Sequence, residues 1–370
     1  MSTAEIKPSP DQEYAIRSIR QWAQGLGGEI SLGGLAGSGK SFVSNIIINE
    51  LKSIGRNVVT LCPTGKAADV LRRKGQDADT IHSAIYLFAG EFERDDGERH
   101  INWDDRDEMK DGGDIVLVDE SSMVNAQMAS DLRSFGKPII WVGDHGQLPP
   151  IGGDPGIMRN PDLLLEKIHR QAEGSGIIEY AHAVREGSIS GDYDNVTRAK
   201  YVSVGDSLNK FGHVDQIICG FNATRASVNK QFRLRSGHRG LLEVGDKIIC
   251  RHNNRQQFIF NGQQFYVRNI MLEDDRSFRC SIESCDSEKR YPDISIVKGG
   301  FGNVKNDFDR SALGSNEILA DYAYAITCHS SQGSSWKRVL VIRQECKAWD
   351  IRRWHYTAST RAEEELFVVG

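Results

Sequence analysis

Two short clusters of residues have the types and spacing needed to hold and hydrolyse a nucleoside triphosphate. The first, Gly34–Ser41, reads G-x-x-x-x-G-K-S and lies between an apolar run and a helix-like stretch. In that context the backbone N–H groups of the loop surround a β-phosphate, and the lysine bridges the β- and γ-phosphates. The residues expected to bind ATP and Mg²⁺ are therefore Gly37, Ser38, Gly39, Lys40 and Ser41, the last through its hydroxyl on the metal.

The second cluster is a pair of carboxylates after an apolar run. Residues 115–118 read Ile-Val-Leu-Val and lead directly into Asp119 and Glu120. A buried parallel strand with this ending places Asp119 in the Mg²⁺ shell and lets Glu120 polarise the attacking water. A further apolar run, 137–143, leads into a polar segment in which Gln147 is placed to sense a γ-phosphate.

Strand, turn and helix signals alternate along most of the chain, as is typical of parallel α/β sheets. The strand at 57–62 ends near Thr64 and Lys66, and ligands of such sheets bind at the carboxyl ends of strands. The α/β pattern begins again after residue 170, without a second P-loop, and a helix over 177–186 opens it. Two α/β units are therefore expected.

Two segments interrupt this pattern. Residues 88–103 read as two short strands joined by Asp96-Gly97, which predicts a small hairpin within an insert at 84–111. Residues 234–317 contain several short strands, among them a hairpin predicted over 258–267 around Asn261-Gly262. This second segment predicts an SH3-like β-barrel inserted into the second α/β unit.

Composition limits the classes of protein that fit. The 370 residues carry a net charge of −5, so binding to a polyanion would depend on a local groove. The seven cysteines form no C-x-x-C pair, which favours reduced, buried thiols in a cytosolic compartment. No secretory leader and no apolar stretch of membrane-spanning length is found, so we expect a cytoplasmic protein that does not contact membranes.

A P-loop unit followed by a second α/β unit with arginines near its strand ends is typical of ATP-driven motors. In such motors the second unit supplies an arginine that neutralises charge developing on the γ-phosphate. Arg361, and with it Arg170, is a candidate for that role, and a structural salt bridge is the alternative for each. For Arg361, in Thr-Arg-Ala before the last strand, we favour the catalytic interpretation.

Taken together, the motifs resemble the superfamily 1B helicases, the group that includes phage Dda and bacterial RecD. The resemblance covers nearly the whole chain, in family order. The matching segments are Asp11-Gln12, Gly34–Ser41, Cys62–Ala68, Asp119-Glu120, Gly143–Pro150, Arg170, Tyr324–Gly333 and Tyr356–Ala362.

The resemblance implies a fold and an activity. The fold would be α/β, with two RecA-like P-loop-type domains in tandem, a hairpin insert in the first and an SH3-like barrel insert in the second. The implied domains are 1–170, with the insert at 84–111; 171–233 plus 318–370; and 234–317. The activity would be ATP-dependent unwinding of duplex DNA by a monomer that translocates 5′→3′ on single-stranded DNA.

The resemblance also implies roles for individual residues. Gln12 would read the adenine, and Arg170 would contact phosphate. The residues expected to face the DNA strand are Thr64, Lys66, His82, Asn222, Thr327, His329 and Ser331. The candidates for a duplex-splitting pin in the hairpin insert are Phe88, Phe92 and Trp103. The expected partners are single-stranded DNA, junctions of single- and double-stranded DNA, and a single-strand binding protein or replisome component.

Two departures and three alternatives accompany this interpretation. Ser330 stands where relatives usually carry a lysine, so one basic contact to DNA is missing or is carried elsewhere. The chain is also short for the group, which favours a compact phage-type enzyme of DNA replication or repair, in the host cytoplasm if phage-encoded. The alternatives are a single-strand translocase that displaces bound proteins, an RNA helicase, and a nucleotide-gated binding module without turnover.

Overall fold

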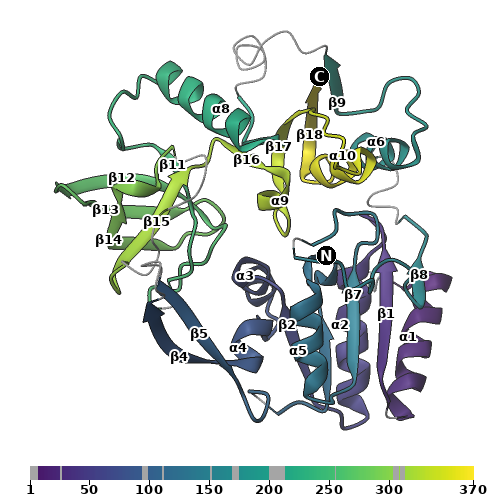
Figure 1. Cartoon of the computed structure of the whole chain (residues 1–370). Helices are drawn as coiled ribbons and strands as arrows, with labels where there is room; N and C mark the ends of the chain where they lie inside the picture. The colour runs from purple at the N-terminus through teal and green to yellow at the C-terminus, as the bar shows by residue number, and fades with distance from the viewer. Residues whose placement is uncertain are drawn as a thin grey trace, which may run out of the picture. The chain divides into compact units, whose positions relative to one another are not determined.

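Figure 1 shows the computed structural model of the chain, which is divided into two compact units. The residues described are 7–25, 27–93, 99–110, 112–150, 152–168, 175–199, 213–254, 256–302, 308 and 313–370, with the backbone alone for 88–93 and 99–105. The first unit comprises residues 1–87 and 104–189, and the second comprises 88–103 and 190–370.

The first unit is a six-stranded parallel sheet with helices packed against it. Its strands, in sheet order, are β3 (Ala78–Thr80), β2 (Val58–Cys62), β6 (Ile115–Val118), β7 (Ile139–Gly143), β1 (Glu29–Gly34) and β8 (Leu163–Leu165). Its helices are α1 (Pro10–Gln24), α2 (Lys40–Ser53), α3 (Gly65–Arg73), α4 (Ile81–Ile85), the 3₁₀ turn η1 (Ser121–Met123), α5 (Ala126–Ser134) and α6 (Gly176–Glu186). The P-loop therefore joins β1 to α2, as predicted.

Both faces of this sheet are buried, which explains why its strands read as continuous apolar runs. Along β7, Ile140 and Val142 pack in the core beneath α1 and α2, whereas Ile139 and Trp141 pack in the core beneath α4 and α5. Successive side chains of a strand point to opposite faces, so an unbroken apolar run fills both cores. The carboxyl edge of the sheet is thereby left to carry polar groups.

The second unit has a five-stranded parallel sheet and a closed barrel. The sheet strands, in order, are β16 (Ala325–Thr327), β10 (Gln216–Cys219), β17 (Trp336–Ile342), β18 (Ala362–Val369) and β9 (Val196–Ala199). The accompanying helices are α8 (Asn222–Arg235), α9 (Cys328–Ser331) and α10 (Ile351–Ser359). The barrel strands are β11 (Lys247–Cys250), β12 (Gln264–Glu273), β13 (Ser277–Ser284), β14 (Arg290–Val297) and β15 (Glu317–Tyr322), with the 3₁₀ turn η2 (Lys298–Gly300) after β14.

These two parallel sheets and the closed barrel confirm the predicted fold class, with one local error. We predicted a hairpin over 258–267, but β12 begins at Gln264 and pairs with β11 instead. Phe258 adopts a left-handed φ of 54°, and the amide of Phe260 donates to the side-chain oxygen of Gln263 at 2.9 Å. The Asn-Gly turn is present, but side-chain hydrogen bonds occupy the backbone that a first strand would need.

The paired strands β4 (Tyr86–Glu93) and β5 (Arg99–Asp105) lie within the predicted insert at 84–111. The turn predicted at Asp96-Gly97 lies outside the described residues. The side chains of the three pin candidates, Phe88, Phe92 and Trp103, also lie outside the described part of the structure.

The proposed domain boundaries differ from the compact units at three places. Residues 88–103 of the insert, proposed as part of the first domain, group with the second unit. The helix that we expected to open the second α/β unit is α6, and it belongs to the first unit. The barrel includes β15, which ends at Tyr322 rather than at the proposed boundary of 317. These differences arise because pairing and packing, rather than sequence order, decide which unit an element joins.

All seven cysteines lie in the described residues, and none of them forms a disulfide. Burial raises the pKa of the Cys219, Cys250, Cys280 and Cys328 thiols to about 12, so these groups stay protonated at neutral pH. Among the described residues, no helix is long and apolar enough to cross a bilayer.

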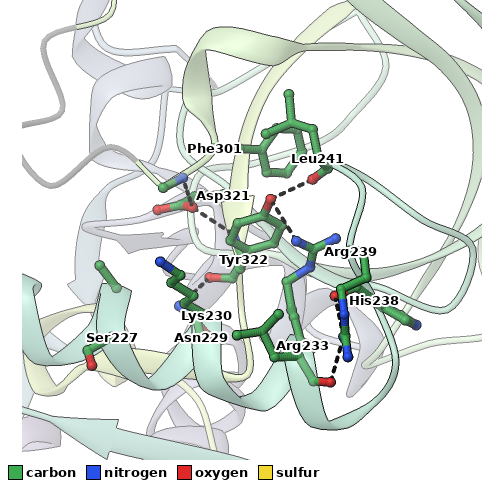
Figure 2. Close-up of a pocket in the computed structure, with 13 residues that line it drawn as sticks. Ser227, Asn229, Lys230, Arg233, His238, Arg239, Leu241, Phe301, Asp321 and Tyr322 are labelled. Carbon is green, nitrogen blue, oxygen red and sulfur yellow. Dashed lines mark hydrogen bonds between the residues drawn. The ribbon is translucent and has the colours of Figure 1, made fainter.

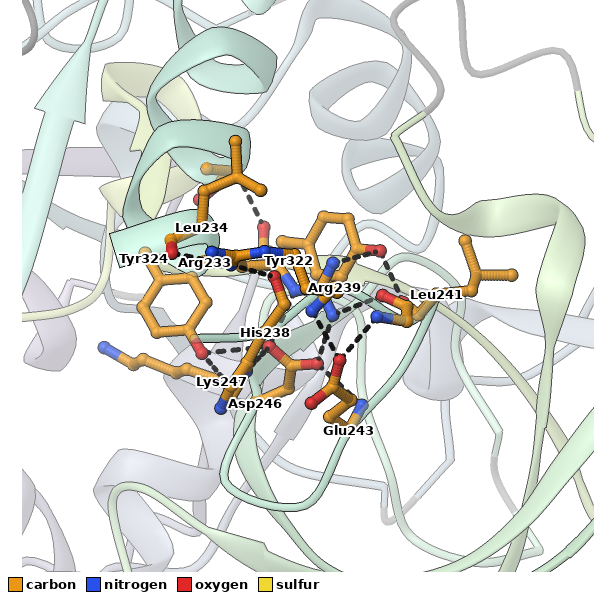
Figure 3. Close-up of polar contacts among 12 residues, drawn as sticks. Arg233, Leu234, His238, Arg239, Leu241, Glu243, Asp246, Lys247, Tyr322 and Tyr324 are labelled. Carbon is orange, nitrogen blue, oxygen red and sulfur yellow. Dashed lines mark hydrogen bonds and ion pairs between the residues drawn. The ribbon is translucent and has the colours of Figure 1, made fainter. Parts of the chain in front are cut away.

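A buried ionic network joins α8 to the barrel (Figure 3). The guanidinium of Arg233 donates to both carboxylate oxygens of Asp246, each at 2.8 Å, and the ring nitrogen Nδ1 of His238 lies 2.8 Å from the same carboxylate. Burial alone would raise the pKa of Asp246, but the hydrogen bonds from Arg233 and His238 outweigh it and lower that pKa. Asp246 is therefore ionised and paired.

A pocket of about 520 Å³ opens beside this network, between α8 and the loop after η2 (Figure 2). Much of its polar lining is engaged within the protein. Asn229 donates to the carbonyl of Tyr322 at 3.1 Å, and Asp321 accepts from the amide of Gly302 at 3.0 Å and from Arg225. The guanidinium of Arg233 lies over the ring of Tyr322, 4.3 Å from its centroid. These contacts fasten α8 to β15.

We predict that Arg233→Ala destabilises the second unit by about 3–5 kcal/mol, because the buried Asp246 carboxylate then lacks its main partner. The exposed pair of Arg268 and Glu283 on the barrel provides the control, and Arg268→Ala is expected to cost less than about 1 kcal/mol. Urea unfolding followed by circular dichroism measures both. Equal losses for the two variants would contradict the role of this network.

His355 predicts a dependence of stability on pH. Burial, helped by the charge of Arg343, lowers its pKa to about 4. The folded state therefore binds fewer protons than the unfolded state between pH 6.5 and 4, so stability is complete above 6.5 and is lost as pH falls. The loss at pH 4 is expected to be about 3 kcal/mol. In urea unfolding across this range, His355→Phe should remove that component, and an unchanged profile would contradict the assignment.

Candidate active site

The P-loop is held in a shape that needs two left-handed glycines. Gly37 and Gly39 have φ values of 84° and 81°, which L side chains rarely adopt, and α2 begins at the next residue, Lys40. The ammonium of Lys40 donates to the carbonyls of Gly34 and Leu35 at 2.7 and 3.1 Å. The side chain of Lys40 therefore folds back over the first residues of the loop. It lies beside the backbone amides at the start of α2.

Gln12 fastens this loop to α1. Its side-chain amide donates to the carbonyl of Ser38 at 3.0 Å, and its side-chain oxygen accepts from the amide of Ser9 at 3.1 Å. The residue is fully buried. Its contacts favour a role in positioning the loop, whereas the adenine-reading role stays a prediction.

The two carboxylates predicted after β6 lie at the same edge of the sheet. Asp119 Oδ1 accepts from the amide of Glu120 at 2.9 Å, and Glu120 has a left-handed φ of 55°. Burial raises the pKa of Asp119, and the charge of Lys40 opposes that rise. A non-glycine residue in a left-handed conformation is strained, and such strain is concentrated at functional sites, which fits Glu120 as the group that orients water.

The third strand end contributes Asp144 and Gln147. The carboxylate of buried Asp144 lies 3.9 Å from the ammonium of Lys40 and accepts from the amide of Gly146 at 2.8 Å. The side-chain amide of Gln147 donates to the same carboxylate at 3.3 Å. Asp144 therefore connects the lysine of the P-loop to the predicted γ-phosphate sensor, and our sequence reasoning did not single it out.

These groups fit a nucleoside triphosphate with Mg²⁺. Within the described residues, the buried oxygens Ser38 Oγ and Gln147 Oε1 have no hydrogen-bond partner, and both belong to segments predicted to contact phosphate or its water. Ser41 and Asp119 would supply one hydroxyl and one carboxylate to the metal. Mg²⁺ usually takes few protein ligands together with phosphate oxygens, and no group of three His, Cys, Asp or Glu side chains gathers in the part described.

The DNA-contact candidates of the first unit lie on α3 and α4, next to strand ends. Thr64 caps α3, because its hydroxyl accepts from the amide of Ala67 at 3.2 Å. Lys66, in the first turn of α3, is buried. His82 is half-buried in α4, with its ring 5.3 Å from that of Tyr86. Of these three residues, Thr64 and His82 retain surface that could meet a strand.

In the second unit, Thr327 caps α9, and its hydroxyl lies 2.9 Å from that of Ser330. Burial lowers the pKa of half-buried His329, so its ring is neutral at pH 7. Ser331 is fully buried and donates to the carbonyl of Cys328 at 2.7 Å, which favours a structural role in α9. Asn222, at the start of α8, is exposed.

The candidate arginine finger, Arg361, is buried within the second unit. Its guanidinium donates to the carbonyls of Thr357 and Ser334 at 3.0 and 3.2 Å and to the hydroxyl of Thr360 at 3.0 Å. These contacts are not the salt bridge of the alternative interpretation, and the catalytic role of Arg361 stays a prediction. The other candidate, Arg170, lies outside the described residues.

Comparisons with known proteins agree with this architecture. A model of the AAA domain family matches residues 8–207, and a model of the UvrD-like helicase C-terminal domain matches residues 322–369. The ATP-dependent RecD2 DNA helicase of Deinococcus radiodurans is 26% identical over 92% of this chain, and the chain spans 47% of that protein. The chain thus spans about half the length, or less, of the curated relatives that it matches.

Solved structures share the fold at low identity. The Pif1 helicase of Candida albicans matches 99% of this chain and 95% of its own, at a TM-score of 0.59 and 16% identity. A Bacteroides Pif1 solved with single-stranded DNA matches 98% of this chain and 92% of its own, at a TM-score of 0.58 and 18% identity.

The chain therefore belongs to the AAA domain family, whose model covers more than half of it. With the helicase C-terminal match and the RecD2 and Pif1 similarities, it is a member of superfamily 1B of the helicases, as the motif series predicted.

Variants at Lys40 in the P-loop and at Glu120 after β6 should distinguish nucleotide binding from turnover. Lys40→Ala removes the cation expected on the β- and γ-phosphates, so hydrolysis is expected to fall below detection. Glu120→Gln keeps the shape of the site but not the charge that orients water, so a fluorescent ATP analogue should still bind while turnover falls roughly 100-fold or more. Steady-state ATPase assays and equilibrium binding measure both effects. Normal hydrolysis by Lys40→Ala would overturn the site.

Proposed function

We propose that this chain is an ATP-driven motor that translocates on single-stranded DNA and separates duplex DNA. One observation carries the proposal. Three separate strand ends supply Lys40, the Asp119-Glu120 pair, and Asp144 with Gln147. Lys40 lies 3.9 Å from the carboxylate of Asp144, and its charge also acts on Asp119. A lysine, a metal-binding carboxylate, a water-orienting carboxylate and a phosphate sensor are the parts that hydrolysis of a γ-phosphate needs.

The roles of these residues follow from their chemistry. Lys40 would exchange the carbonyls of Gly34 and Leu35 for phosphate oxygens, so its positive charge is available without a large rearrangement. Ser41 and Asp119 would hold Mg²⁺, which neutralises charge on the phosphates when it is bound. Glu120 would orient and deprotonate the attacking water. Gln147 would sense the γ-phosphate and transmit its presence to the loop that follows.

DNA is the expected track. RecD2 is named a DNA helicase, and a Bacteroides Pif1 is described as bound to single-stranded DNA. In this chain the N-terminal ends of α3, α4 and α9 carry small polar groups and imidazoles. Such groups suit sequence-independent contact with a DNA strand. Thr64, His82, Thr327 and His329 are the residues that we propose for these contacts.

The second unit would supply the arginine finger. Arg361 follows α10 and lies directly before β18, at the end of the motif that resembles helicase motif VI. Its present donors face backbone carbonyls and a hydroxyl, which are neutral acceptors. A γ-phosphate would compete well for them, since charge-assisted hydrogen bonds are stronger than neutral ones. Arg170 is proposed as a second phosphate contact.

Further details of the proposal come from the sequence and from the family resemblance. They comprise 5′→3′ polarity, action as a monomer in the cytoplasm, a bacteriophage origin, a role in DNA replication or repair, and cooperation with a single-strand binding protein or replisome component. The hairpin of β4 and β5 is proposed as the pin that divides the strands, with Phe88, Phe92 and Trp103 as its candidate residues.

We predict that the purified chain, with ATP and Mg²⁺, opens a DNA duplex carrying a 5′ single-stranded tail and leaves the matched 3′-tailed duplex closed. Strand separation is read by fluorescence dequenching, with Lys40→Ala as the control that should open neither. Opening of only the 3′-tailed duplex would contradict the polarity.

If neither duplex opens although DNA stimulates hydrolysis, the helicase activity is contradicted in favour of a translocase that displaces bound proteins. Stronger stimulation by RNA strands would contradict DNA as the track. Nucleotide binding without turnover on any strand would indicate a binding module.

A further inference from the structure

The last helix of the first unit, α6, lies against the nucleotide site. A hydrogen bond links His182 to the backbone at Ala36 of the P-loop, and the charge of Asp144 acts on the same imidazole. One turn further along, Arg185 lies against the turn after β7. Neither residue was predicted to be part of the site, since both were assigned to the second α/β unit.

The contact of Arg185 with this turn is close. A Cβ atom built on Gly146 would lie 2.8 Å from Nε of Arg185, 3.0 Å from its Cδ, and 2.6 Å from Cδ2 of Leu35. Real Cβ atoms essentially never approach other heavy atoms this closely, so any side chain at 146 would displace Arg185 or the P-loop leucine. Gly146 is therefore a point of close approach between α6, the P-loop and the turn.

Burying part of the Arg185 side chain also has an energetic cost. Its Nε is buried and has no hydrogen-bond partner within the described residues. Buried N–H groups are nearly always paired in folded proteins, so an unpaired one calls for an explanation.

The turn beneath Arg185 carries the groups that face the phosphates. The amide of Gly146 donates to Asp144, and Gln147 follows immediately, with its amide on the same carboxylate. We propose that Arg185 is a positioning residue of the ATP site, which clamps the Asp144–Gln147 turn against the P-loop so that Gln147 is presented at the γ-phosphate. This inference rests on the proposed ATP hydrolysis and adds to it a residue that none of the motifs contains.

Arg185→Ala tests the proposal through the split between kcat and KM. Loss of the clamp should misplace Gln147, and small misplacements at a reacting centre cost roughly 10- to 100-fold in rate. We therefore expect kcat of DNA-stimulated hydrolysis to fall about tenfold or more, while KM for ATP and the stoichiometry of binding of a fluorescent ADP analogue stay near wild-type values. Arg185→Lys, which keeps the aliphatic stem over Gly146 and the charge, should recover part of the loss and serves as the test if the alanine variant does not fold.

Arg20→Ala is the matched control. Arg20 lies in the same unit, in an exposed ion pair with Glu50, away from the turn. Its substitution should leave both kinetic constants unchanged. An alanine variant at 185 that folds and hydrolyses ATP like the Arg20 control would overturn the proposal, and a fall in binding stoichiometry alone would reduce Arg185 to a structural residue.

A double-mutant cycle with Gly146→Ala sharpens the assignment. The added methyl group should displace the Arg185 side chain, so removing Arg185 in that background should cost at least threefold less in kcat than it costs in the wild type. Additive losses would contradict contact-mediated positioning. A wild-type chain that does not hydrolyse ATP at all would instead refute the proposed function, and the two failures are therefore distinct.

Discussion

Parallel strands all end at one edge of their sheet, and the candidate active site depends on that constraint. β1 delivers the P-loop, β6 delivers Asp119 and Glu120, and β7 delivers Asp144 and its turn, although these segments are widely separated in sequence. Because β7 lies between β1 and β6, its polar end is the natural link between the lysine of the loop and the two carboxylates. The apolar cores on both faces hold the strands in place, so the residues at their carboxyl ends are held in fixed positions as well.

Charge balance explains how the site is arranged before nucleotide binds. Lys40 is surrounded by two loop carbonyls, by Asp144 at 3.9 Å and by the field of Asp119. Neutral carbonyl acceptors hold an ammonium less strongly than phosphate oxygens do, so the exchange on binding is favourable. The proposed arginine finger of the second unit, Arg361, also donates to neutral acceptors, namely two carbonyls and a hydroxyl.

Much of the fold and the core of the site could be predicted from the sequence, because each depends on contiguous residues. Gly34–Ser41 and Asp119-Glu120 combine a motif with an apolar strand, and the structure places both at one sheet edge. The boundary at 170 and the site role of Arg185 could not be predicted, because they depend on which unit α6 packs against. The hairpin predicted over 258–267 was wrong for a related reason: Gln263 and Asn254 capture the backbone on either side of Phe258.

The most direct test of an ATP-driven motor is the rate of ATP hydrolysis by the purified chain, with Mg²⁺, measured in the presence and absence of a single-stranded DNA oligonucleotide. The arrangement of Lys40, Glu120 and Gln147 predicts slow hydrolysis alone and strong stimulation by the strand, lost when Mg²⁺ is chelated. A rate that stays at background under every condition, although nucleotide binds, would contradict the assignment of this edge as a hydrolytic site.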